Sequence, residues 1–228
     1  MGLTNFYPFE CIKIESDEEK VVELYEMMLA DGKKKGYTPV IIIEDEHGLM
    51  QENIKFAKED FGSYDNFVKT CLEEYKELDP EFFFKARKSI YEEDGLLDLE
   101  QEEEINEKCN TVYLGEKNES VFIAKIPTKK PYEIFAYVPM GGYNDCPDNI
   151  THMAIAKYWF EKYNAVPICI GSDTIQYKVD KVVDKSQCDN LALEQYFYCG
   201  DIVLQGIGSL ENLKNTISKS NIWYFWWD

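Results

Sequence analysis

The chain has 228 residues, with 43 acidic and 24 basic side chains and a formal net charge of -19. Its hydrophobic content of 45% is enough to bury a sizeable core, so we expect a soluble globular protein. The excess of carboxylates repels phosphate groups, which argues against nucleic acids and anionic membrane surfaces as partners. A basic protein would instead be attracted to this surface.

The cysteine and histidine content predicts a cytoplasmic protein with no metal or cofactor site. The seven cysteines are odd in number and include no C-x-x-C pair, which is typical of a reduced compartment. With only two histidines, His47 and His152, the chain lacks the ligand spacings of a zinc site. The N-terminal residues show no secretory leader, and no window approaches the about 18 apolar residues of a membrane span. The oligomeric state stays open.

The N-terminal region alternates strand and helix patterns. Residues 9–14 predict a strand. Residues 16–19 then supply an N-cap and an acidic first turn for a helix that runs to about Lys35 and is stopped by Gly36. The apolar, β-branched run over residues 38–45 is typical of a strand covered on both faces. A strand, a helix and a strand in this order indicate two parallel neighbouring strands. Apolar residues at three- and four-residue spacing predict three short helices over residues 48–92.

An acidic connector follows these helices. Residues 92–107 carry nine carboxylates and no basic side chain, a composition typical of a solvated linker or a frayed helix. We therefore place a boundary near residue 110, between an N-terminal region (1–110) and a C-terminal domain (111–228). The N-terminal region has 29 acidic and 13 basic residues, a net charge of -16, whereas the C-terminal domain carries -3.

The C-terminal domain also mixes strands and helices. Residues 120–127 and 132–140 predict paired strands, and Asp148 is placed to cap a helix over residues 149–163. The further predicted elements are strands at 166–171, 174–179 and 222–228, a strand-like segment at 201–205, and helices near 187–198 and 209–219. The chain is therefore predicted to be α/β or α+β, with a mixed sheet flanked by helices, as two sub-domains or one two-lobed domain.

The loop GGYNDCPDN (141–149) joins a predicted strand to a predicted helix and contains the best candidate for chemistry. A cysteine at a helix N-terminus can have its thiol pKa lowered, and His152 follows Cys146 closely enough to suggest a nucleophile and a base. However, Asp145 and Asp148 flank the thiol and would raise its pKa. A six-residue helical offset would also point the two side chains apart. We therefore favour a buried structural cysteine.

The segment WYFWWD (223–228) is the densest aromatic stretch. As a strand it would be apolar on both faces, which favours core packing over a platform for stacking a ligand. Asp228 stands beside indoles, and its carboxylates require hydrogen-bond donors. Loop amides or indole N–H groups are the expected donors.

Four segments together resemble a bacterial domain-of-unknown-function family, the one numbered 4253. They are GGYNDCP, YWFEKYNAVPICIGSDTIQYKV, LEQYFYCGDIVLQG and WYFWWD, and the resemblance covers about residues 115–228. It implies a bacterial cytoplasmic α/β domain and no assigned reaction. The polar residues that match the motifs are Asn144, Cys146, Asp201, Gln205 and Asp228. If these residues meet in space, they form a site.

The leading functional hypothesis is a non-enzymatic, acidic binding module that contacts a basic protein, as immunity proteins do. The alternative is a thiol-dependent hydrolase or a small-ligand-binding domain centred on the GGYNDCP loop. In the hydrolase, Cys146 would be the nucleophile, His152 or Asp201 the base or orienting group, and Asn144 or nearby loop amides the oxyanion donors. The expected binding residues are Asn144, Gln205, Trp226 and Asp228. A third interpretation makes the motif residues purely structural.

Overall fold

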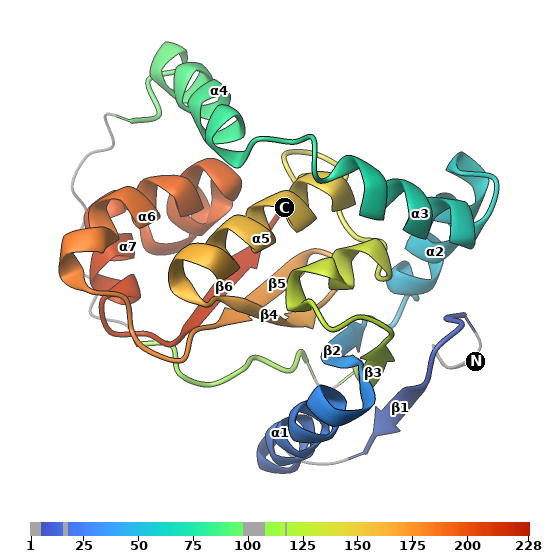
Figure 1. Cartoon of the computed structure of the whole chain (residues 1–228). Coiled ribbons are helices and arrows are strands. Elements are labelled where there is room, and N and C mark those ends of the chain that lie inside the picture. The colour runs from blue at the N-terminus through green and yellow to red at the C-terminus, as the bar shows by residue number, and fades with distance from the viewer. Residues whose placement is uncertain (1–5, 16–17, 98–107, 117) are drawn as a thin grey trace.

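The computed structural model describes residues 6–15, 18–97, 108–116 and 118–228 (Figure 1). Six strands form one open sheet in the order β1-β3-β2-β4-β5-β6. The strands are β1 (Cys11–Ile14), β2 (Thr38–Glu44), β3 (Ser120–Ile126), β4 (Val166–Ile170), β5 (Thr174–Lys178) and β6 (Ile222–Trp226). Among these described strands, β2 and β4 are the one parallel pair, so the sheet is mixed and the predicted fold class is confirmed. The sheet combines strands from both sides of residue 110, and the boundary proposed there stays a prediction.

The expected pairing of β1 with β2 is wrong, because β3 lies between them. Both strands run antiparallel to β3 and so point in the same direction without contacting each other through hydrogen bonds. β3 is apolar and buried at its centre, so its backbone N–H and C=O groups need partners at both edges. β1 supplies one set of partners and β2 the other.

One helix covers one face of the sheet. α1 (Glu18–Lys35) buries Val21, Tyr25 and Met28 in a cluster with Ile41 and other apolar side chains of that face. Three lysines in its last turn suit the negative end of the helix dipole. Gly36 follows with a φ of 89°, the left-handed conformation that ends the helix as predicted.

The remaining helices belong to the larger core cluster, which includes the opposite face of β2. The three helices predicted over residues 48–92 are confirmed as α2 (Leu49–Asp60), α3 (Tyr64–Glu74) and α4 (Pro80–Glu93). The helices that follow residue 110 in the described ranges are α5 (Asn149–Tyr163), α6 (Lys185–Tyr198) and α7 (Leu210–Ile217). None of the helices in the described ranges has the length and hydropathy needed to cross a membrane. Most of the acidic connector lies outside those ranges.

Two predicted strands are wrong. Residues 131–136 form a 3₁₀ helix, because Tyr132 to Ala136 are all buried without alternation and both edges of β3 are already occupied. Residues 202–207 form a π-helix that follows α6 instead of a strand. It ends at Gly208, whose φ of 76° turns the chain toward α7.

The centre of the C-terminal core is Trp159 of α5, which is fully buried. Its ring stacks on Phe225 at 5.6 Å and meets the edge of Tyr198 at 5.0 Å. The indole N–H donates a hydrogen bond to the carboxylate of Glu194 on α6, at 2.9 Å. Trp159 therefore fixes α5, α6 and β6 against one another.

The side chain of Asn149 ties the start of α5 to the segment before it. Its amide nitrogen donates to the carbonyl oxygens of Phe135, at 2.7 Å, and Val138, at 2.8 Å. Its carbonyl oxygen accepts from the backbone N–H of Met140 at 3.1 Å. All three backbone partners belong to buried residues.

Replacing this side chain, Asn149→Ala, should lower the free energy of unfolding by about 2–4 kcal/mol, because three buried backbone groups would lose their partner. The adjacent Asp148→Ala is the matched control. It removes only the N-cap bond to Thr151 and should cost about 1 kcal/mol. Urea denaturation of both variants measures the difference, and equal losses would contradict the assigned role of Asn149.

Candidate functional site

Three segments far apart in the sequence meet at one surface through four polar residues. Asn144 donates from its side-chain amide to the backbone oxygen of Asp228 at 2.9 Å. The backbone N–H of Asp228 donates to Asp201 at 3.1 Å, and the Gln205 amide donates to the other oxygen of Asp201 at 3.0 Å. We call Asn144, Asp201, Gln205 and Asp228 the Asp201 network.

The GGYNDCPDN loop reaches this network through a tight turn. Gly141 and Gly142 have φ angles of 81° and 79°, and Asn144 has a φ of 47°, all in the left-handed region. A Cβ atom at Gly141 would lie 2.0 Å from the backbone oxygen of Pro147. The loop geometry therefore requires glycine there, and it directs the Asn144 side chain toward Asp228.

Cys146 and His152 lie together beneath the loop, and the expectation that they point apart is wrong. The Cys146 sulfur is 3.6 Å from Nε2 of His152, and Nδ1 of His152 is 2.7 Å from the Tyr198 hydroxyl. Helix α5 begins only at Asn149, so the helical rotation does not govern the direction of Cys146. The loop folds the sulfur back over the first turn of α5.

The environment of this pair opposes thiol chemistry. Cys146 is 4% exposed and His152 is fully buried. Burial, together with the nearby Cys199, raises the pKa of the Cys146 thiol well above its usual range. Burial lowers the pKa of His152 to about 3. At neutral pH the pair is thus a protonated thiol beside a neutral imidazole, as favoured for a structural cysteine.

The other predicted site residues occupy different positions. Asp201 bonds to Asp228 and Gln205. Nδ1 of His152 instead contacts the Tyr198 hydroxyl, so Asp201 does not orient the imidazole. Trp226 is half-buried and lines a separate cavity beside β6. The Cys199 thiol donates to the backbone oxygen of Trp226 at 2.9 Å. This bond connects the segment that leads to Asp201 with the strand beside the cavity.

Arg87 was missed by the sequence analysis although it is the one arginine of the chain. Its guanidinium donates to Asp145 in the loop at 3.2 Å and to the backbone oxygen of Phe197 in α6 at 3.3 Å. Its planar head also lies 5.3 Å from the Tyr91 ring centroid. The sequence signal for its role was that the chain has a single arginine. A guanidinium forms several directed hydrogen bonds that a lysine cannot. Arg87 anchors α4 to the loop.

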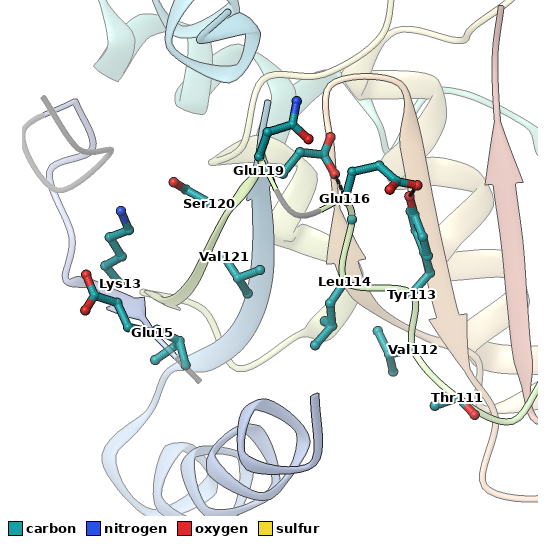
Figure 2. Close-up of a pocket in the computed structure, with 13 residues that line it drawn as sticks. Lys13, Glu15, Thr111, Val112, Tyr113, Leu114, Glu116, Glu119, Ser120 and Val121 are labelled. Atoms are coloured by element: carbon teal, nitrogen blue, oxygen red, sulfur yellow. Dashed lines mark hydrogen bonds between the residues drawn. The ribbon is translucent and has the colours of Figure 1, made fainter. Parts of the chain in front are cut away.

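A polar cavity of about 900 Å³ lies between β1, β3 and the segment before β3 (Figure 2). Glu116 and Glu119 occupy one side, where the Tyr113 hydroxyl donates to Glu116 at 3.0 Å, and Lys13 and Glu15 occupy the other. Among the residues that the structure describes, no group of three His, Cys, Asp or Glu side chains could hold a metal ion.

Residues 122–228 match the family model described as Domain of unknown function (DUF4253). This match confirms the suspected resemblance. No curated protein and no solved structure gives a match. The DUF4253 region includes the whole Asp201 network, Cys146 and His152, so these residues lie within the part of the chain that the family model covers. Arg87 and the three helices α2 to α4 lie outside it.

Alkylation should separate Cys146 from the more exposed Cys109, which is half-buried. We expect iodoacetamide to modify Cys146 more than about tenfold more slowly, because its thiol is buried and protonated. Peptide mapping by mass spectrometry gives both rates, with guanidinium-unfolded protein as the control in which they become similar. Fast modification of native Cys146 below neutral pH would contradict the buried, protonated state.

The pKa of His152 should make stability depend on pH. Its pKa falls from 6.5 when unfolded to about 3 in the fold, so only the unfolded chain takes up a proton between these values. Its contribution is complete above pH 6.5 and declines by about 1.4 kcal/mol per pH unit as the pH falls toward 3. Denaturation curves of the wild type and His152→Gln, recorded over this pH range, should differ by this slope. If the stability of the wild type and that of His152→Gln vary with pH in the same way, the lowered pKa of His152 is disproved.

Proposed function

We propose that the protein is a non-enzymatic binding module whose acidic N-terminal region contacts a basic protein partner. The observation that carries the proposal is the concentration of charge, -16 over residues 1–110 against -3 over residues 111–228. Such a field steers oppositely charged partners and raises their association rate. Immunity proteins that neutralise toxins provide an analogy for this behaviour.

Exposed apolar side chains among these carboxylates supply the apolar contacts of an interface, which charge alone does not provide. Phe56 of α2 is 57% exposed and Phe82 of α4 is 71% exposed. Acidic residues adjoin both, with Glu52, Glu59 and Asp60 near Phe56 in sequence and Glu81 beside Phe82. Aromatic side chains are common anchors of interfaces, and charged rims mainly set rate and specificity. An acidic surface with aromatic anchors suits a basic partner that has apolar pockets.

The burial of the Cys146 thiol supports the non-enzymatic interpretation over the hydrolase. A nucleophile requires access to substrate and a thiolate, and the pKa values of Cys146 and His152 move in the opposite directions from those that an activated pair needs. The residues of the Asp201 network bond mainly to one another. In this proposal they hold the loop, the π-helix and the end of β6 together.

Affinity capture from a bacterial lysate tests the proposal. The wild type should retain a basic protein at low salt and lose most of it at high salt, because exposed charges are screened beyond about 8 Å at physiological ionic strength. The double variant Phe56→Ser, Phe82→Ser should weaken capture of the same protein by at least about tenfold.

The matched control is Val182→Ser, Leu204→Ser, which removes two exposed apolar side chains outside the acidic region. It should capture the partner as the wild type does. The proposal is abandoned if no basic protein is retained at either salt concentration. Equal capture by the wild type and the Phe56→Ser, Phe82→Ser variant would contradict the role of these two side chains as anchors.

A further inference from the structure

A cavity of about 520 Å³ lies beside β6, outside the Asp201 network. Its walls come from α6, the π-helix, α7, β6 and the chain near Cys109, and Figure 1 shows α6 and α7 next to β6. The volume falls in the range of small-molecule sites, about 300–1,000 Å³. Its lining contains no charged side chain and is rich in aliphatic and aromatic residues, among them Leu213, Ile217 and Trp226.

Three of the lining residues hold buried polar atoms with no hydrogen-bond partner. They are the amide nitrogen of Gln195, the hydroxyl of Thr216 and the indole nitrogen of Trp223. Gln195 is 2% exposed and Trp223 is 3% exposed. Buried polar groups are nearly always paired, and unpaired ones call for a partner. Two of these three atoms are obligate donors, so the missing partner is an acceptor.

The outer edge of β6 adds backbone groups to the same wall. The Ile222 N–H donates to the oxygen of Cys109 at 3.1 Å, and the oxygen of Trp226 accepts from Cys199. Because backbone groups alternate in direction along a strand, the N–H and C=O of Tyr224 point to the same outer edge. Tyr224 lines the cavity, so its edge offers one donor and one acceptor.

We propose that this cavity binds a small neutral molecule with a flat apolar body and a carbonyl or amide group. The aromatic and aliphatic walls suit the apolar body, and the unpaired donors suit the carbonyl oxygen. The absence of charged side chains from this lining disfavours an anion, whose burial without a counter-charge is costly. The site is independent of the acidic N-terminal surface.

Three probes with the same ring system separate the contributions of the apolar body, the hydrogen-bonding group and the charge of the ligand. They are 2-naphthamide, 2-ethylnaphthalene and 2-naphthoate. Saturation-transfer NMR titrations of the full chain give their affinities. The neutral amide should bind at least about tenfold more tightly than the hydrocarbon and the anion, through several hydrogen bonds of about threefold to tenfold each. Equal affinity for amide and hydrocarbon would overturn the hydrogen-bonding assignment, and failure of the amide to bind would overturn the site.

Two variants with a matched control tie binding to the cavity. Gly206 lines the cavity, and a Cβ atom there would find its nearest neighbour at an ordinary 3.5 Å, so the backbone accepts a side chain and Gly206→Phe adds bulk at the cavity wall. It should weaken 2-naphthamide binding by more than about tenfold. Leu204→Phe, on the same π-helix but exposed and outside the lining, should leave it unchanged.

The second variant, Gln195→Met, preserves the length of the side chain and removes the amide donor. It should reduce the preference for 2-naphthamide over 2-ethylnaphthalene by about threefold to tenfold while keeping hydrocarbon binding. Thermal melting and near-ultraviolet circular dichroism establish that each variant is folded. Undiminished amide binding in folded Gly206→Phe would place the ligand elsewhere.

Discussion

The burial of Trp159 is the constraint on which the C-terminal half of the structure depends. Its indole N–H is satisfied by Glu194 of α6, and its ring packs on Tyr198 and Phe225. Tyr198 in turn meets the ring of His152, and Phe225 belongs to the strand that leads to Asp228. The geometry of the loop, the thiol and the Asp201 network therefore follows from close packing around one side chain.

Local features of this fold could be predicted because local chemistry determines them. Asp148 caps α5 as its side chain type suggested, and the β-branched run of β2 is buried along its length. The insertion of β3 between β1 and β2 could not be predicted, since hydrogen bonding between distant segments depends on the whole sheet. The convergence of the motif residues was stated only as a condition, and the structure fulfils it for Asn144, Asp201, Gln205 and Asp228. The contact between Cys146 and His152 depends on a non-helical loop whose path the sequence pattern does not specify.

The Asp201 network and the cavity beside β6 lie at the same end of the chain, because Asp228 of the network follows β6 and residues of β6 line the cavity. Cys199 bonds to the backbone of Trp226, whose side chain lines the cavity, and Asp228 follows two residues later in the network. The π-helix joins the same two places, since Gln205 belongs to the network and Gly206 to the cavity wall. π-Helical segments are rare and frequently occur at functional sites.

The position of β3 has a consequence for how the chain folds during synthesis. β1 and β2 leave the ribosome well before residues 120–126, and neither has its antiparallel partner until then. The apolar side chains of β2, from Val40 to Ile43, belong to the finished core but stay without their neighbouring strand in the nascent chain. Synthesis proceeds at about 5–20 residues per second, so this interval lasts several seconds. During it, β2 presents unpaired backbone N–H and C=O groups beside apolar side chains, the features through which extended segments associate with one another.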